Sequence, residues 1–153
     1  MKKFMQKAIE LSIESVKNGG GPFGAVIVKD GKIISATSNS VTQTNDPTAH
    51  AEVNAIRMAT QKLNTFDLSG CEIYTSCEPC PMCLGAIYWA RLDKIYFANT
   101  KTDAKNIGFD DSFIYEEIDK PYEKRSIKTV QMMRDEALEA FKLWQDTDDK
   151  IEY

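Results

Sequence analysis

The chain has 153 residues, a formal net charge of −4, 42% hydrophobic residues and 27% charged residues. This composition is typical of a soluble globular protein, and the length predicts a single domain over residues 1–153. The negative charge argues against a nucleic-acid partner, because phosphate-binding surfaces carry an excess of Lys and Arg. Charged residues interrupt the apolar residues near the N-terminus, so we expect no signal peptide, no membrane span and a cytoplasmic protein.

The N-terminal part predicts a helix and a hairpin. Apolar residues recur at helical spacing over residues 3–18, with Met5, Ile9, Ile13 and Val16 in the stripe. Residues 24–29 and 32–38 are short and rich in β-branched side chains, and they flank the turn-forming pair Asp30-Gly31. These segments indicate two antiparallel strands.

The middle of the chain predicts two more helices that alternate with strands. Asp46 suits an N-cap and Pro47 suits the first helical position, which places His50 and Glu52 in or just after the first turn. Residues 79–83 begin a further helix through Ala90. Residues 71–75 and 94–98 are predicted strands. Beyond residue 100 we expect a short helix at 111–119 and an edge strand at 126–132. Residues 134–146 are expected to form an amphipathic helix whose apolar stripe contains Ala137, Leu138, Phe141 and Trp144.

Two motifs carry the chemistry. His50, the only histidine, lies two residues before Glu52, and residues 79–83 supply Cys80 and Cys83 at a helical spacing. One imidazole and two thiolates make a three-ligand zinc site whose fourth position is available to water. A His-x-Glu motif followed by Pro-Cys-x-x-Cys is the signature of zinc-dependent base deaminases. The sequence therefore predicts a hydrolytic deaminase with one zinc ion on His50, Cys80 and Cys83.

Glu52 is the predicted proton carrier. Zinc lowers the pKa of a water ligand to about 7, and Glu52 would move the released proton to the substrate ring and help protonate the departing amine. Because there is no second histidine, the general acid and base must be a carboxylate, a thiol or water. Glu52 is the best placed of these.

The cysteines leave other interpretations open. Cys71 and Cys77 are expected to be small core residues. An iron–sulfur cluster is disfavoured, because no cysteine follows Cys83, where the motif needs a fourth one. A non-catalytic binding module stabilised by zinc would close the site with Cys71 or Cys77 as fourth ligand.

Residues 45–52 and 75–83 resemble the cytidine deaminase-like superfamily, whose tRNA-adenosine and free-base branches share these stretches. Residues 21–28, residues 108–115 and the terminal Tyr153 resemble the short bacterial guanine deaminases. The similarity covers nearly the whole chain and is most diffuse over residues 123–150. It implies an α/β fold in three layers, α/β/α, around a central mixed sheet of about five strands.

The resemblance also implies a substrate pocket. Asn39 would hydrogen-bond the base, Phe23 and Trp89 would help form the pocket, and Asp111 would read the guanine edge and assist release of the amine. A carboxylate only accepts hydrogen bonds, which matches the adjacent N–H donors of guanine. The alternative for Asp111 is a helix cap.

A homodimer is implied as well, in which the C-terminal helix and tail, about residues 134–153, cover an active site, either their own or the partner's. Tyr153 would then place its ring and terminal carboxylate near the base. A frayed terminus without function is the ordinary alternative.

The expected reaction converts guanine to xanthine and ammonia. Guanosine, cytosine or an aminated triazine stay open as substrates, because motif spacing does not define a pocket. A tRNA adenosine is less favoured, since the chain lacks a concentrated basic face at its C-terminus. Two thiolates and one imidazole would also accept other soft or borderline metal ions.

Overall fold

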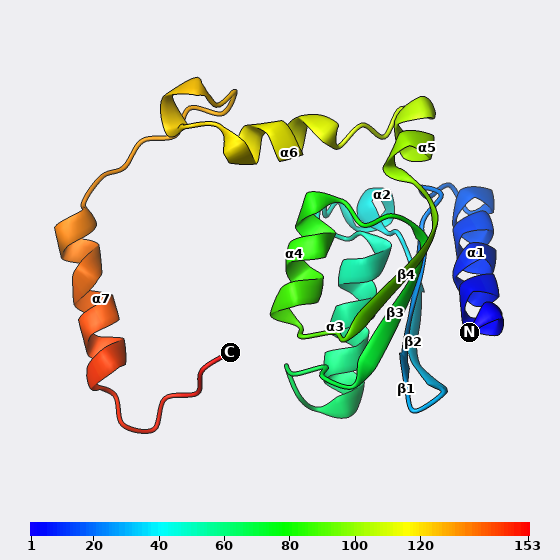
Figure 1. Ribbon diagram of the computed structural model, residues 1–153, viewed down its shortest axis with the longest axis horizontal. Coiled ribbons are helices and arrows are strands. Elements are labelled where there is room, and N and C mark those ends of the chain that lie inside the picture. The colour runs from blue at the N-terminus through cyan, green and yellow to red at the C-terminus, as the bar shows by residue number, and fades with distance from the viewer. The chain divides into compact units, whose positions relative to one another are not determined.

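The computed structural model describes residues 1–153, which divide into two compact units, Met1–Ser112 and Phe113–Tyr153 (Figure 1). The helices of the first unit are α1 (Lys2–Lys17), α2 (Val41–Thr44), α3 (Ala51–Leu63), α4 (Pro81–Trp89) and α5 (Lys101–Asn106). Its strands are β1 (Gly24–Lys29), β2 (Lys32–Ser38), β3 (Cys71–Cys77) and β4 (Lys94–Asn99). The remaining elements are α6 (Ser112–Asp119), the 3-10 turn η1 (Tyr122–Lys124) and α7 (Arg134–Asp146).

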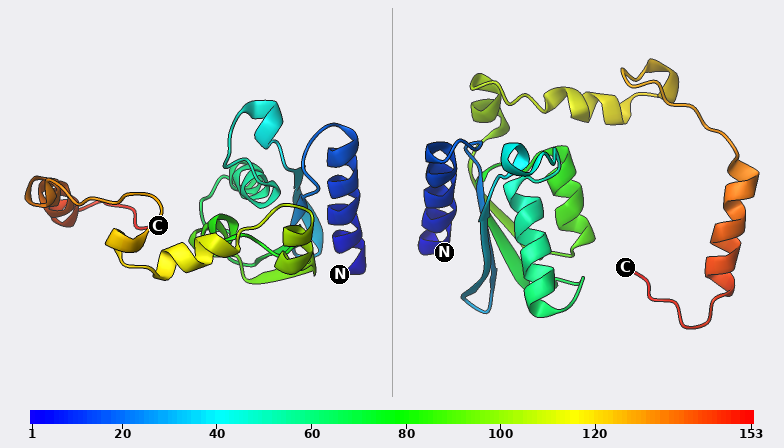
Figure 2. Two further views of the ribbon diagram at one scale, coloured as in Figure 1. Left: turned by 90° about the horizontal axis from the view of Figure 1, so that it is seen from above. Right: turned by 180° about the vertical axis from the view of Figure 1, so that it is seen from behind.

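The four strands form one mixed sheet in the order β2-β1-β3-β4. β1 is antiparallel to both β2 and β3, whereas β3 and β4 run parallel. α1 covers one face of the sheet, and α3 and α4 cover the other (Figures 1 and 2). The predicted α/β/α layering and mixed sheet are confirmed, with four strands in place of about five.

The strand expected at residues 126–132 is absent. The residues of this segment pair with no strand of the sheet, and none of them is buried. A strand requires a neighbour that satisfies its backbone donors and acceptors. Within the chain this segment has no such neighbour, so β-branched composition alone misled the prediction.

The face that α1 presents to the sheet also differs from the predicted one. The buried residues of α1 are Phe4, Ala8, Ser12 and Ser15, whereas Ile13 and Val16 of the predicted stripe are more than half exposed. The helix packs so close to β1 that a side chain on Gly24 would overlap the carbonyl oxygen of Ala8. Such an approach needs small residues at the contact and places larger apolar side chains at its margins.

The second helix begins later than predicted. The side chain of Asp46 accepts hydrogen bonds from the backbone N–H and the hydroxyl of Thr48, and so caps a local turn. The chain stays extended at His50, which is the N-cap of α3, and Glu52 is its second helical residue. The unpredicted helix α2 precedes this turn. Because the helix begins only at Ala51, the His50 side chain lies at the N-terminus of α3.

Buried side chains lie on both faces of the sheet because strand residues alternate. Ala25, Ile27 and Ile73 pack with α3 and α4, whereas Val26 and Tyr74 pack with α1. Tyr74 also stacks on Tyr96 with ring centroids 4.5 Å apart. This core holds the N-terminal ends of α3 and α4 in fixed positions.

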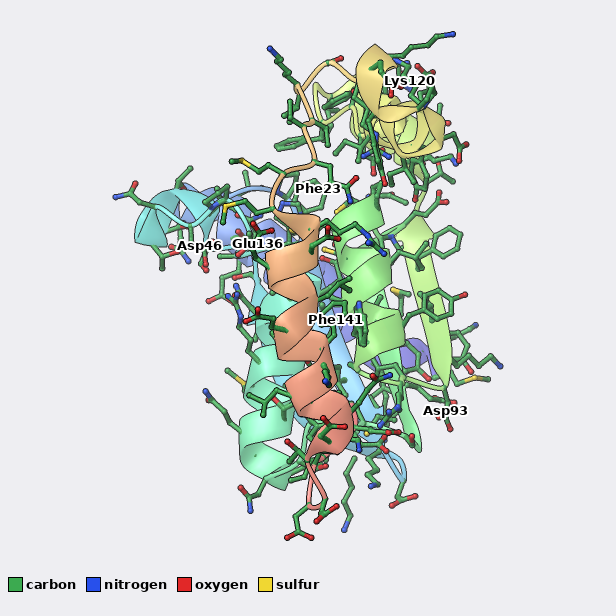
Figure 3. The ribbon with its side chains drawn as sticks, turned by 90° about the vertical axis from the view of Figure 1, so that its left-hand side faces the viewer. Phe23, Asp46, Asp93, Lys120, Glu136 and Phe141 are labelled. Carbon is green, nitrogen blue, oxygen red and sulfur yellow. The ribbon has the colours of Figure 1, made fainter.

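The second unit buries none of the residues of its helices. In α7, Phe141 is 71% exposed and Trp144 44% exposed, although both belong to the predicted apolar stripe. Figure 3 draws these side chains with Glu136 and Phe141 labelled. No helix of the chain combines the length and the apolar character needed to cross a bilayer.

Candidate metal centre and active site

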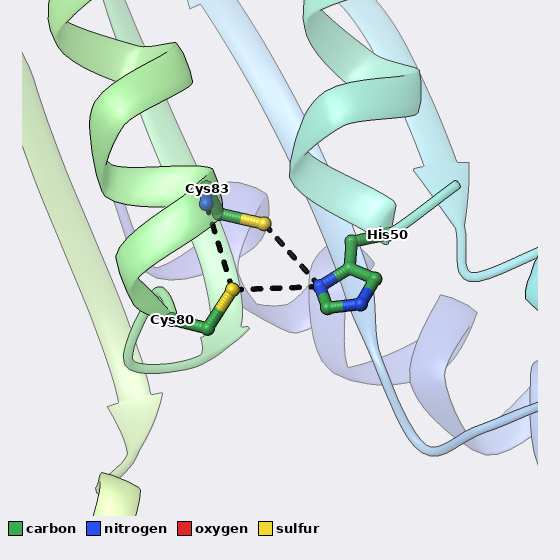
Figure 4. A group of neighbouring side chains, drawn as sticks. All are labelled: His50, Cys80 and Cys83. Atoms are coloured by element: carbon green, nitrogen blue, oxygen red, sulfur yellow. Dashed lines mark hydrogen bonds between the residues drawn. The ribbon is translucent and has the colours of Figure 1, made fainter. Parts of the chain in front are cut away.

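His50, Cys80 and Cys83 converge between the N-terminal ends of α3 and α4 (Figure 4). The Nδ1 atom of His50 lies 3.5 Å from each of the two sulfur atoms. Tetrahedral zinc with ordinary Zn–N and Zn–S bond lengths separates a nitrogen from a sulfur ligand by about 3.5 Å. The type and spacing of the donors therefore fit zinc.

The two cysteines owe their positions to the start of α4. Cys80 is the N-cap, Pro81 occupies the first turn, and the sulfur of Cys80 accepts a hydrogen bond from the backbone N–H of Cys83. A proline fits this position because no backbone donor is needed there. Backbone N–H groups and the positive end of the helix dipole both favour a thiolate.

The protonation of the three ligands suits a divalent cation. The pKa of Cys80 is lowered to about 4, chiefly because Cys83 donates a hydrogen bond to its sulfur and His50 adds another. The pKa of Cys83 is raised, first by that same hydrogen bond and then by burial. The hydrogen bond to Cys80 raises the pKa of His50. Cys80 is thus a ready thiolate, and a metal ion would displace protons from the other two ligands.

Glu52 lies beside these ligands and is only 5% exposed. Its Oε2 is 3.4 Å from the sulfur of Cys83, and its Oε1 accepts a hydrogen bond from the Thr75 hydroxyl at 3.0 Å. Burial is the main cause that raises the pKa of this carboxyl. A raised pKa brings a carboxylate nearer to the range in which it can both accept and return a proton.

Neither of the remaining cysteines reaches the cluster. Cys71 lies at the opposite end of β3, paired with Lys29. Cys77 is close to the carbonyl of Thr100, and burial raises the pKa of its thiol to about 11. The site therefore has three protein ligands, which is the arrangement of catalytic zinc sites and not of closed structural ones.

Phe23 and Asn39 lie together at the ends of β1 and β2. The backbone N–H of Asn39 donates to the carbonyl of Phe23, and its side-chain carbonyl accepts from the N–H of Val41. The amide NH2 of Asn39 is the group left to donate outward. The ring of Phe23 meets that of Phe109 edge-on, with centroids 5.0 Å apart.

Asp111 carries a buried oxygen that lacks a partner. Its Oδ1 is inaccessible and makes no hydrogen bond, and burial followed by the Cys80 charge raises the pKa of the carboxyl. The neighbouring Asp110 instead accepts from the N–H of Ser112 and pairs with Lys105. Asp110 therefore supplies the capping hydrogen bond, and the buried Oδ1 of Asp111 has no hydrogen-bond partner within the chain.

Trp89 and Tyr153 were the other predicted pocket residues. Trp89 ends α4, at the opposite end of the helix from Cys80 and Cys83, and is 69% exposed. Tyr153 is 73% exposed and belongs to the second unit. Their roles at the substrate stay predictions.

Comparisons with known proteins identify the family to which the chain belongs. Residues 1–99 match the family model of the cytidine and deoxycytidylate deaminase zinc-binding region. This match spans both motifs that meet at the cluster. The chain belongs to this zinc-binding deaminase family. The expected zinc cofactor and enzyme class are confirmed.

Among members of the deaminase family, the guanine deaminase of Bacillus subtilis is 56% identical over 98% of this chain and 97% of its own. The crystal structure of that protein superimposes with a TM-score of 0.96 over 99% of this chain and 98% of the other. A solved guanine deaminase from Nitrosomonas europaea is 36% identical over 71% of this chain and 63% of its own, with a TM-score of 0.68. A tRNA-specific adenosine deaminase from Aquifex aeolicus is 45% identical over 62% of this chain and 63% of its own.

Two residues of this deaminase site had no role predicted from the sequence. Thr75 and Phe109 lie within residues 75–83 and 108–115, but only the structure shows their contacts with Glu52 and Phe23. The alternation of β3 could have placed Thr75 on the same face as Ile73. No sequence signal identifies its partner, because the two residues lie in elements far apart in the chain.

Proposed function

We propose that the protein hydrolyses guanine to xanthine and ammonia, with a zinc ion on His50, Cys80 and Cys83 and with Glu52 as proton carrier. The observation that carries this function is the convergence of these ligands beside a buried carboxylate, in a chain with 56% identity to a guanine deaminase over nearly its whole length. The reaction exchanges the exocyclic amine at C2 of guanine for oxygen from water.

Zinc, when bound, lowers the pKa of a water ligand to about 7 and so supplies hydroxide near neutral pH. Glu52 Oε2 takes up the proton, because it is the carboxylate oxygen that faces the ligands. The same oxygen returns the proton to the ring nitrogen beside the reacting carbon and then serves the departing amine. Burial supports this role by excluding competing water from the carboxylate.

Recognition of guanine is assigned to Asp111, Asn39 and Phe23. The unpartnered Oδ1 of Asp111 supports hydrogen bonding to the N1–H and 2-amino donors of the base. The Asn39 amide donates to an acceptor on the base, and the rings of Phe23 and Phe109 form an apolar wall. Trp89 and Tyr153 complete the pocket in the assembled protein.

That assembly is a homodimer in which α7 and the tail of one copy cover the active site of the other. The apolar stripe of α7 supports the proposal, because a helix with none of its residues buried gains its stability from a partner. In such a dimer each chain forms one deaminase domain with a C-terminal arm. The cytoplasmic location expected from the sequence belongs to the same proposal.

The test is ammonia release by the purified protein with its native metal from guanine, guanosine, cytosine, adenine and an aminated triazine. We expect rapid turnover of guanine alone. Turnover of another compound instead would keep the zinc mechanism and overturn the role of Asp111. Zinc-loaded protein that acts on none of them would overturn the proposed reaction, and a salt-sensitive tRNA gel shift would then favour a tRNA substrate.

A further inference from the structure

The side chain of Thr75 is buried against the carboxylate of Glu52. Thr75 lies near the middle of β3, paired with Ala25 of β1 and Phe97 of β4, and is 1% exposed. Its Oγ1 donates toward two acceptors, Glu52 Oε1 at 3.0 Å and the carbonyl oxygen of Cys77 at 2.9 Å, so the single hydroxyl proton is shared between them. The hydrogen bond to Oε1 ties Glu52, on α3, to β3, an inner strand of the sheet.

The two oxygens of Glu52 have different surroundings. Oε1 points to Thr75 and the sheet, whereas Oε2 faces the sulfur of Cys83 at 3.4 Å. The last torsion of a glutamate side chain is soft and has broad minima, so packing alone does not fix the plane of the carboxylate. A charge-assisted hydrogen bond to one oxygen fixes that plane and holds the other oxygen in place.

We propose that Thr75 is a positioning residue that anchors Glu52 Oε1 and so keeps Oε2 directed at the metal ligands and the substrate. This inference rests on the proposed function, because it assigns proton transfer to Glu52. The hydroxyl of Thr75 bonds to Glu52 and to the Cys77 carbonyl, neither of which is a metal ligand. Loss of the Thr75 hydroxyl should lower the rate of the chemical step and leave substrate binding unchanged.

The most direct test compares Thr75→Ser with Thr75→Ala. Both variants lose the methyl group, and only the serine keeps the hydroxyl. We expect Thr75→Ser to retain most of the activity and Thr75→Ala to lose kcat by about 10- to 100-fold, with KM and zinc content close to those of the wild type. Rates are measured on guanine, or on whichever base of the panel the wild-type protein turns over.

Ser35→Ala is the matched control. The hydroxyl of Ser35 is also buried between the sheet and α3, where it donates to the carbonyl of Ala55 at 2.8 Å, but it contacts no group of the site. We expect its kcat to stay within about threefold of the wild type. Should Thr75→Ala fail to fold, Thr75→Val takes its place in the comparison, because valine keeps the methyl group of threonine and has a second methyl in place of the hydroxyl.

Equal kcat values for the serine and alanine variants would overturn the role of Thr75. A rise in KM with unchanged kcat would do the same, because that pattern belongs to a residue that binds substrate. These outcomes are separate from failure of the proposed function. In that case the wild-type protein itself leaves guanine unchanged, and the comparison moves to the base that it does hydrolyse.

Discussion

The surroundings of Glu52 bury its carboxylate and shift its pKa in the direction that suits a proton carrier. Desolvation raises its pKa, and hydrogen bonds from Cys83 and Thr75 lower it, which offsets part of the effect of burial. An unpaired buried carboxylate would carry a large cost in stability. The opposing effects of burial and hydrogen bonding keep the Glu52 carboxyl ionisable although it is buried.

Asp111 is the residue whose replacement tests base recognition. Asp111→Asn turns half of an acceptor-only group into a donor that opposes the N–H groups of guanine. We expect kcat/KM on guanine to fall by about 10- to 100-fold, the value of a hydrogen bond to a charged group, with zinc content unchanged. Asp110→Asn is the control. Its carboxylate caps Ser112 and pairs with Lys105, so equal losses in both variants would contradict the role of Asp111.

The ligand protons predict how zinc binding depends on pH. Cys83 and His50 both have raised pKa values, whereas Cys80 is already a thiolate above a pH of about 4. Zinc must displace one proton from Cys83, and a second from His50 below the pKa of the imidazole. The logarithm of the zinc association constant should therefore rise by about one unit per pH unit above the pKa of the His50 imidazole and by about two below it.

Competition with a chromophoric chelator between about pH 6 and pH 9 measures this dependence. A zinc association constant that does not change with pH would show that both thiols are already ionised before the metal binds.

At the level of elements, Gly24 controls how closely α1 approaches the sheet. A side chain at Gly24 would overlap the Ala8 carbonyl and lie 2.8 Å from the backbone nitrogen of Ser12, both of them backbone atoms that cannot easily move away. We expect Gly24→Ala to lower the free energy of unfolding by about 1–3 kcal/mol. Urea unfolding measures this change. A loss below about 0.5 kcal/mol would mean that α1 shifts away from the sheet to accommodate the added methyl group.

Local patterns predicted the elements whose partners are close in sequence. The hairpin, with its Asp30-Gly31 turn, was predicted at its observed bounds, and α7 was as well. The errors have two causes. The contact face of α1 depends on Gly24, a residue outside the helix. The start of α3 depends on a competing local turn, in which Asp46 accepts from Thr48 and does not cap the helix.

The same distinction holds for the site. The three metal ligands and Glu52 could be proposed from spacing, because each pair shares the start of one helix. The roles of Asn39 and Asp111 came from family resemblance. The role of Thr75 could not be predicted from the sequence, because its hydrogen bond joins strand β3 to helix α3 and no local spacing encodes that contact.

For the whole molecule, the exposed apolar stripe of α7 predicts association. We expect sedimentation equilibrium to give twice the 17.3 kDa of one chain. Replacing Leu138 and Phe141 together by Asp removes apolar surface from the stripe and should give a monomer with lower activity. A wild-type protein that stays monomeric at micromolar concentration would contradict the dimer.

The terminal segment tests whether the arm covers a site. Deleting residues 151–153 removes the ring and the carboxylate of Tyr153, and we expect a lower catalytic efficiency on guanine with unchanged zinc content and mass. Unchanged efficiency would mean that the tail is an ordinary frayed terminus.

The proposed deamination of guanine depends on a buried glutamate beside a three-ligand zinc site. Xanthine formation by the wild type and by Glu52→Gln, with zinc content measured on the same samples, tests this dependence. We predict that the variant keeps its zinc and loses kcat by about 10²- to 10⁴-fold, because glutamine cannot carry the proton. Turnover of guanine by Glu52→Gln at the wild-type rate would contradict this dependence.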